Sequence, residues 1–326
     1  MLIDPVSPWA EAPPQGPVIF LMGPTASGKS DVGMALAKRY SLEIVNADSV
    51  QIYRGFSIGA AKPGDEERSQ VRHHLLDRVS PPEVYSADRY REEAWGVIRD
   101  CHARRVIPLF VGGSGLYFRA VECGLATMPS MDPSIREGLR QEGLRWGWPA
   151  LHDRLKQCDP ELAQRIPEGD SHRIVQGLAV VTATGIPLSL WQQRQPPPPP
   201  LLVLKLAFSW PRGLLYERID ARFDQMLALG LLDEIEMLWK AGYDRDHPAM
   251  KAVGYRQLFP FFDGHCTLEM AVEHAKRESR RYAKRQVTWF KREPGLMMIP
   301  WDDKSLAFDR VEAFLGQTDF YSVRGL

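Results

Sequence analysis

The stretch VIFLMGPTASGKS, residues 18–30, decides the fold of this chain. It joins an apolar run with the length of a buried strand, residues 18–22, to the pattern G-x-x-x-x-G-K-[ST] in residues 23–30. A helix is expected directly afterwards, over residues 29–39. A loop of this pattern between a strand and a helix binds phosphate groups through its backbone N–H groups. We therefore expect a phosphate loop at the carboxyl end of a buried strand.

Each part of this loop has a chemical role on a bound diphosphate. Its backbone and the start of the following helix form an anion-binding nest, Lys29 adds a positive charge, and the Ser30 hydroxyl is a ligand for Mg²⁺. The motif indicates a diphosphate and does not by itself indicate a nucleotide. The predicted diphosphate-binding residues are Gly23, Pro24, Thr25, Ala26, Ser27, Gly28, Lys29 and Ser30.

Two further segments share this arrangement of an apolar strand followed by a loop. Residues 42–45 lead into NADSVQ at 46–51, and residues 106–111 lead into GGSGL at 112–116. A helix over residues 87–104, with Ser86 as its N-cap, lies between them. Continuous apolar strands alternating with helices predict an α/β fold, with a parallel sheet covered by helices on both faces. Ligands bind beyond the carboxyl ends of such strands, so the three loops are expected to converge on one site.

Asp48 is the only acidic residue expected to end a strand and face the phosphate loop. A phosphate-loop ATPase needs a carboxylate at such a position to hold Mg²⁺ through water, and residues 106–111 end in glycines instead. Asp48 could therefore serve the metal, as in a small-molecule or nucleotide kinase, or act as a base on an acceptor. The residues alone leave both roles open.

Two other positions are candidates for phosphate contact. The Ser114 hydroxyl is expected to lie near the phosphates. Arg218 and Arg222 are four residues apart on a helix predicted over residues 214–229, so they share a face and could reach a leaving diphosphate. The alternative is that both arginines pair with the nearby Asp220 and Asp224.

The rest of the chain predicts a core interrupted by an insertion. Apolar residues at helical spacing and no clear strand indicate a small helical domain, and a run of five prolines marks its far boundary. A strand at 201–208 returns to the sheet, followed by helices over 214–229 and 231–240 and a short strand at 295–301. The expected division is a flexible tail at 1–16, a catalytic core at 17–130 and 201–302, a helical insertion at 131–200, and a C-terminal tail at 303–326.

Composition excludes several classes of protein. The 326 residues hold 41 Lys+Arg and 41 Asp+Glu, so the chain is not a uniformly basic nucleic-acid binder. The four cysteines form no C-x-x-C pair, and the adjacent His73 and His74 would point to different faces, so no zinc site is expected. No apolar run is long enough to cross a membrane, and residues 1–17 lack the basic start of a signal peptide. A cytoplasmic location is expected.

The neutral total conceals one strongly basic segment, KRESRRYAKRQVTWFKR at residues 276–292. It holds eight basic residues and one acidic residue. On a helix, Arg277, Arg281 and Lys284 would form a cationic stripe, and the segment also contains three aromatic residues. Charge combined with aromatic rings is typical of binding to RNA or single-stranded nucleic acid, while a solvated helix face is the alternative.

Together these motifs resemble the bacterial tRNA dimethylallyltransferase family. The resemblance covers about residues 17–295 and follows the family's order. It rests on GPTASGKS (23–30), NADSVQIYRG with IGAAKP (46–63), HHLLD (73–77), YSADRY (85–90), PLFVGGSGLY (108–117), VGYRQ (253–257) and AKRQVTWF (283–290).

The resemblance implies a P-loop NTPase-like core that transfers a dimethylallyl group from dimethylallyl diphosphate to N6 of adenosine 37 in tRNA. The phosphate loop would then hold that diphosphate, not ATP, with Mg²⁺ on Ser30. Asp48 would be the general base, and Ser114 and Arg222 would contact the phosphate oxygens. A nucleotide-binding kinase is the alternative enzyme, and an RNA-binding protein without activity is the alternative outside enzymes.

The resemblance also implies that a flipped adenosine enters the site and that the insertion grips the anticodon stem-loop. A core with one insertion needs no partner, so a monomer is expected. Ser30 and Ser114 replace the family's usual threonines and keep the hydroxyl group. Ala60 also replaces a usual threonine but has no hydroxyl group. The expected tRNA contacts, including the two from the basic stripe, are Asp48, Ser49, Val50, Gln51, Arg136, His172, Arg173, Ile174, Val175, Gln176, Lys251, Ala252, Val253, Gly254, Tyr255, Arg256, Arg281 and Lys284.

Overall fold

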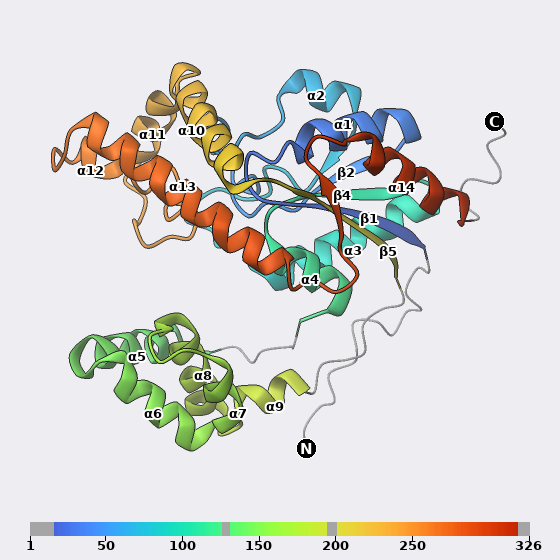
Figure 1. Ribbon diagram of the computed structural model, residues 1–326. Coiled ribbons are helices and arrows are strands. Elements are labelled where there is room, and N and C mark those ends of the chain that lie inside the picture. Colours follow the sequence, from blue (N-terminus) through green and yellow to red (C-terminus); the bar gives the residue numbers. More distant parts are fainter. Residues whose placement is uncertain (1–15, 126–130, 194–200, 319–326) are drawn as a thin grey trace. The chain divides into compact units, whose positions relative to one another are not determined.

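The computed structural model describes residues 16–125, 131–193 and 201–318, which fall into two compact units (Figure 1). The larger unit lies within Pro8–Glu122 and Pro199–Leu326, and the smaller one lies within Cys123–Pro198. The tail expected at 1–16 lies outside the described residues except for Gly16, and so does the proline run. No helix in the described ranges is long and apolar enough to cross a membrane.

The larger unit is built on a six-stranded, wholly parallel sheet, as predicted. The phosphate-loop strand β1 lies between β4 and β5, with Phe20 beside Phe110 in the register of the first pair. The order is β3-β2-β4-β1-β5-β6. The strands are β1 (Pro17–Met22), β2 (Glu43–Asn46), β3 (His73–His74), β4 (Pro108–Gly112), β5 (Leu202–Ser209) and β6 (Met297–Pro300).

Helices cover both faces of this sheet because successive residues of each strand point to opposite sides. Ile19 and Leu21 of β1 pack in a core with α1 and α14, whereas Phe20 and Met22 pack with α3 and α4. The helices of the larger unit are α1 (Lys29–Tyr40), α2 (Asp65–Gln70), α3 (Ala87–Ala103), α4 (Gly115–Cys123), α10 (Arg212–Ala228), α11 (Leu231–Lys240), α12 (Phe259–Phe262), α13 (Leu268–Phe290) and α14 (Ser305–Gly316).

The structure corrects the tail expected at 303–326. Residues 305–316 form α14, whose Ala307, Val311 and Leu315 recur at four-residue spacing and are buried against the sheet. His73 and His74 form the short edge strand β3 beside β2. The side chain of Ser86 caps α3 as predicted, because its oxygen accepts a hydrogen bond from the N–H of Arg89.

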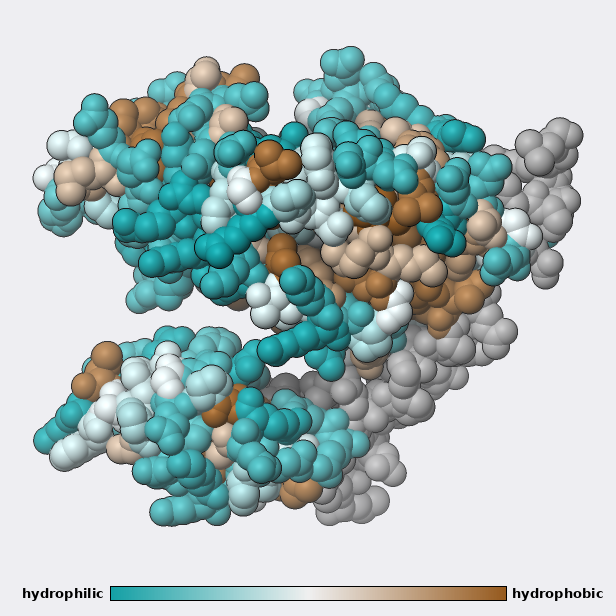
Figure 2. Space-filling view, viewed as in Figure 1, coloured by the Kyte–Doolittle hydropathy of each residue, from teal (hydrophilic) through white to brown (hydrophobic). Residues whose placement is uncertain are grey.

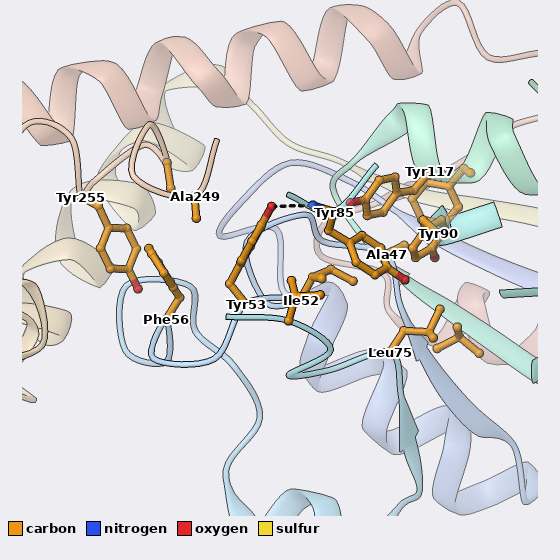
Figure 3. Close-up of a cluster of buried hydrophobic side chains, with 14 of the residues drawn as sticks. Ala47, Ile52, Tyr53, Phe56, Leu75, Tyr85, Tyr90, Tyr117, Ala249 and Tyr255 are labelled. Atoms are coloured by element: carbon orange, nitrogen blue, oxygen red, sulfur yellow. Dashed lines mark hydrogen bonds between the residues drawn. The ribbon is translucent and has the colours of Figure 1, made fainter. Parts of the chain in front are cut away.

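An aromatic core lies beneath the loop that follows β2 (Figure 3). The rings of Tyr90 and Tyr117 stack with centroids 3.8 Å apart, and the Tyr90 hydroxyl donates to the carbonyl of Asn46. The N–H of Tyr85 donates to the Tyr53 hydroxyl at 3.0 Å. Packed rings, with the hydroxyl groups of Tyr53 and Tyr90 hydrogen-bonded, make this a rigid base for the residues that follow β2.

The smaller unit is helical, with no strand among residues 131–193. Leu155, Ile174 and Leu178 belong to its own apolar core, and the buried Asp159 accepts hydrogen bonds from the N–H groups of Leu162 and Ser189. Its helices are α5 (Pro133–Trp146), α6 (Trp148–Cys158), α7 (Pro160–Arg165), α8 (Ser171–Thr184) and α9 (Leu188–Gln193).

Gly112, at the end of β4, is expected to tolerate no side chain. A Cβ there would lie 2.1 Å from the backbone oxygen of Ala47, so the loop that carries Asp48 would have to move. We expect Gly112→Ala to lower the free energy of unfolding by about 3 kcal/mol, measured by denaturant titration. Gly96→Ala is the matched control, since Gly96 lies within α3 with open space beside it. That variant should gain up to about 1 kcal/mol, and equal effects of the two would contradict this account.

Candidate active site

A cavity of about 340 Å³ opens at the carboxyl ends of β1, β2 and β4. The phosphate loop, the loop after β2 and Gly112 all contribute to its wall, so the three loops converge as predicted. Helices α10 and α13 close it with side chains distant in sequence. Among the residues that line it are Thr25, Lys29, Ser30, Asp48, Ser49, Val50, Gln51, Arg222, Lys251, Tyr282 and Gln286.

The phosphate loop has the backbone conformation of an anion nest. Ala26 and Gly28 both have positive φ, 61° and 81°, and α1 begins at Lys29. The first turn of a helix leaves N–H groups without partners inside the helix, and these favour a bound anion. Ser27 adds a buried hydroxyl that has no hydrogen-bond partner among the described residues. The loop is therefore prepared for a phosphate group.

Lys29 is held in an unusual electrostatic environment. Its ammonium group donates to the carbonyl of Pro24 at 3.2 Å. The pKa of Lys29 is lowered from 10.5 to about 8, chiefly by burial and also by the positive charge of Arg222, while Asp48 opposes both effects. Lys29, Arg222 and Asp48 thus interact at one point, where two cations face one carboxylate. This excess of positive charge favours an anionic ligand.

This pKa predicts how diphosphate affinity depends on pH. Lys29 loses its charge in the free protein as the pH rises through about 8, whereas a bound diphosphate favours the charged form. Affinity should therefore fall above pH 8, and binding at pH 9 should take up a proton from solution. Calorimetry in buffers of different ionisation enthalpy measures that uptake, and Lys29→Met serves as the control for the ligand's own titration. No uptake by wild type at pH 9 would contradict the assignment.

Asp48 is fixed by its neighbour Asn46. The N–H of Asp48 donates to the Asn46 side-chain oxygen at 2.9 Å, and the Asn46 amide donates to the carbonyls of Asp48 and Leu75. One carboxylate oxygen of Asp48, Oδ1, accepts from the N–H of Val50 at 2.8 Å. The other accepts no hydrogen bond from a described residue, and Asp48 lines the cavity. One oxygen thus orients the carboxylate and leaves the other for a ligand.

Ser114 joins two of the three loops. Its hydroxyl oxygen accepts from the N–H of Ser49 at 3.0 Å, and its own N–H donates to the carbonyl of Ala47. The hydroxyl hydrogen remains available as a donor, although Ser114 is not among the residues found to line the cavity. These two hydrogen bonds place Ser114 beside the loop that carries Asp48.

The two arginines of α10 have different surroundings. Asp220 and Asp224 pair with Arg280 and Lys276 of α13, at 2.5 and 2.7 Å, and so do not neutralise them. Arg218 donates from Nε to the carbonyl of Ala26 and stacks on Trp210, so it braces the phosphate loop. Arg222 lines the cavity and has no ion pair with a described residue, and burial lowers its pKa. Arg222 is the arginine available to a ligand.

Two structural residues were missed by the sequence analysis. The buried carboxylate of Glu234 in α11 accepts from the N–H groups of residues 57–59 and from the Tyr255 hydroxyl at 2.6 Å. It thereby joins two segments of the cavity wall. Gln286 of α13 accepts from the N–H of Thr25 and donates to the carbonyl of Gly113, both at 3.0 Å. Gln286 lies in a motif interpreted as an RNA contact, and its partners are too distant in sequence to be expected.

The basic segment forms the second half of α13, and the surface over this helix is largely hydrophilic (Figure 2). Arg281 pairs with Glu278 at 2.7 Å. Arg277 and Lys284 are exposed without an ion pair to any described residue, which leaves part of the cationic stripe free for phosphates. In the 251–256 segment only Lys251 and Arg256 are exposed, while Ala252 and Tyr255 are in the core.

The expected tRNA contacts of the smaller unit divide in the same way. Arg136, His172 and Arg173 are exposed, and Gln176 is half-buried. Ile174 and Val175 are buried in the apolar core of this unit, so their side chains cannot reach RNA. The structure corrects the expectation for these two residues, because they lie on the core-facing side of α8.

One other cluster in the described ranges could hold a metal ion by proximity. Glu43, His74 and Cys101 bring their ligand atoms within 4.8 Å of one another. Arg104, however, binds both oxygens of Glu43, at 2.6 and 2.7 Å, and lowers the pKa of Glu43 to about 2. Burial raises the pKa of Cys101 to about 12, so its thiol stays protonated. Because Arg104 occupies the carboxylate of Glu43 and the thiol of Cys101 is neutral, this cluster is an ion-pair network and not a metal site.

Similar proteins include tRNA dimethylallyltransferases. The family model described as IPP transferase matches residues 51–293. A protein named tRNA dimethylallyltransferase from Magnetococcus marinus is 50% identical over 300 residues, covering 90% of this chain and 98% of the relative. One of the same name from Alkalilimnicola ehrlichii is 45% identical over 306 residues, covering 92% and 96%.

Solved structures agree with this similarity. The full-length tRNA isopentenylpyrophosphate transferase of Bacillus halodurans is 33% identical, with a TM-score of 0.67 over 92% of this chain and 98% of that one. A eukaryotic dimethylallyltransferase acting on tRNA has a TM-score of 0.79 over 95% of this chain and 82% of its own, at 24% identity. The second likeness concerns the fold alone.

Proposed function

Because the chain belongs to the IPP transferase family, we propose that it transfers the dimethylallyl group of dimethylallyl diphosphate to N6 of adenosine 37 in tRNA. The products are N6-isopentenyladenosine and diphosphate. One observation carries the proposal: a phosphate loop, two half-buried cations and an oriented carboxylate share one cavity. The loop and the two cations suit a leaving diphosphate, and the carboxylate suits an amine that must lose a proton.

The reaction makes one C–N bond and breaks one C–O bond. The diphosphate leaves with the electron pair of the C–O bond, and Lys29, Arg222 and the loop N–H groups stabilise the charge that develops on it. The N6 nitrogen attacks the allylic carbon. The free oxygen of Asp48 accepts the N6 proton, while Ser114 offers a hydroxyl hydrogen to a phosphate oxygen.

Mg²⁺ fits the oxygen donors of this cavity. The exposed Ser30 hydroxyl and the diphosphate oxygens are the hard ligands that this ion prefers, and Ser30 is the residue that would hold it. When bound, Mg²⁺ would neutralise charge on the departing diphosphate. Lys29 and Arg222 act on the same charge from the protein side.

A stacked adenine must leave the anticodon loop to reach such a cavity. We infer that Ser49, Val50 and Gln51 contact the flipped nucleotide, since all three line the cavity beside Asp48. The free cations of α13 and the exposed basic residues of the smaller unit suit the RNA backbone. We further propose that the protein acts as a monomer in the cytoplasm.

Mass spectrometry of the modified RNA tests this function directly. The protein is incubated with Mg²⁺, dimethylallyl diphosphate and an unmodified tRNA that carries A37, and the RNA is then digested to nucleosides. N6-isopentenyladenosine is expected, and its formation should be unaffected by omitting ATP. Transfer of the γ-phosphate of ATP to any acceptor, with no modified nucleoside, would favour the kinase that shares this loop. RNA binding without either product would favour a protein that only binds RNA.

A further inference from the structure

Gln286 occupies an unusual position on α13. The helix presents Lys284 and Arg285 to solvent. The next residue, Gln286, is only 6% exposed and lines the cavity. A buried amide side chain is costly unless its oxygen and nitrogen both find partners. The hydrogen bonds of Gln286 therefore indicate the structural role of this side chain.

Both ends of the amide are satisfied by backbone groups from different loops. Oε1 accepts from the N–H of Thr25 in the phosphate loop, and Nε2 donates to the carbonyl of Gly113, each at 3.0 Å. One partner is a donor and the other an acceptor, so only one orientation of the amide satisfies both. The side chain thus hydrogen-bonds to two loops that are far apart in the sequence.

The space around this amide is tightly filled. A Cβ on Gly113 would lie 2.3 Å from Nε2 of Gln286 and 3.2 Å from the backbone oxygen of Gly23. The phosphate loop, the loop after β4 and the Gln286 amide therefore meet in contact. No space remains there for a larger residue at position 113.

From this geometry we propose that Gln286 is a positioning residue for the diphosphate site. It holds Thr25 and Gly113 at a fixed separation, so it sets where the phosphate loop lies relative to the Asp48 loop. Gly112, next to Gly113, packs on Ala47, which precedes Asp48. The inference rests on the proposed function because it assigns the loop to a diphosphate substrate.

Two substitutions separate this role from simple packing. Gln286→Met keeps the volume but leaves the Thr25 N–H and the Gly113 carbonyl without partners. Gln286→Glu keeps the acceptor for Thr25 but, when ionised, places a negative charge against the Gly113 carbonyl and near the diphosphate. A protonated Glu regains a donor and loses the charge. Its pKa is expected to be raised by burial, so recovery should begin as the pH falls.

The experiment titrates the full chain with inorganic diphosphate and Mg²⁺ by calorimetry at pH 5.5 and pH 8, and tRNA binding is measured alongside. We expect Gln286→Met to weaken diphosphate binding at least about 10-fold. We expect Gln286→Glu to weaken it more at pH 8 than at pH 5.5, relative to wild type at each pH. The affinity for tRNA should change less than about 2-fold, because the side chain is buried away from the exposed cations. Thr288→Ala is the control, since Thr288 is an exposed α13 residue whose hydroxyl donates to its own helix at Lys284.

Unchanged diphosphate affinity in Gln286→Met would overturn the inference. Equal losses of diphosphate and tRNA affinity, with no pH dependence in Gln286→Glu, would also overturn it and assign the residue a general packing role. Diphosphate binding is measured without any transfer reaction. Diphosphate affinity that depends on Gln286, in a protein that modifies no tRNA, would therefore reject the proposed function and leave this inference standing.

Discussion

Asp48→Asn is expected to lower kcat for tRNA modification between about 100-fold and 10,000-fold, with little change in the affinity for tRNA or diphosphate. The amide keeps the shape of the carboxylate, and its oxygen can still accept from the N–H of Val50. It cannot accept the proton that N6 must lose. Single-turnover rates with saturating substrates measure this loss separately from binding.

The same substitution should also change the pH dependence, because Asp48 raises the pKa of Lys29. Without that carboxylate the pKa of Lys29 falls below about 8, and the loss of diphosphate affinity at alkaline pH should begin at lower pH. Asp31→Asn is the matched control. Asp31 is exposed in the first turn of α1 and interacts with Arg222, but it does not line the cavity. An Asp48→Asn enzyme with the wild-type rate would remove the general base from this account.

Arg222→Met is expected to weaken diphosphate binding about 100-fold and to leave the protein as stable as wild type or more stable. Arg222 is a half-buried cation without an ion pair among the described residues, and desolvation lowers its pKa. Replacing a desolvated charge that has no ion-pair partner with an apolar side chain of similar size removes a desolvation penalty. We expect the free energy of unfolding to rise by about 1 kcal/mol.

Opposite changes in binding and stability identify Arg222 as a residue retained for its ligand. Calorimetry with diphosphate and denaturant unfolding of the same samples measure both. Lys276→Met is a suitable control, because Lys276 forms an ion pair with Asp224 on α10 and does not line the cavity. A large loss of stability in Arg222→Met, with diphosphate affinity unchanged, would show that Arg222 has a structural role only.

Local patterns predicted most of the core correctly. The apolar run before the phosphate loop forms β1, and the helix after it begins at Lys29 as expected. The parallel sheet follows from strands that are apolar on both faces, which is why three loops could be assigned to one edge. β3 escaped prediction because two residues are too few to show a period. The apolar spacing of α14 was present in the sequence and overlooked.

Contacts between distant segments could not be predicted in this way. Gln286 meets Thr25 across 261 positions, and Glu234 meets Ser57 across 177. A single side chain among many of its type carries no local signal for such a partner. The expected tRNA contact of Ile174 failed for another reason: its four-residue spacing from Leu178 already indicated a core face of α8. Periodicity was the better guide at that position.

The central claim is that one cavity places a leaving diphosphate on the phosphate loop and an attacking amine on Asp48. Its most direct test is the stoichiometry of a single turnover, in which released diphosphate and N6-isopentenyladenosine are measured in the same quenched samples. We predict that the two products form at a ratio of one to one and at the same rate, with no inorganic monophosphate. Release of diphosphate without modified adenosine, or modification that proceeds unchanged in Lys29→Met, would contradict the claim.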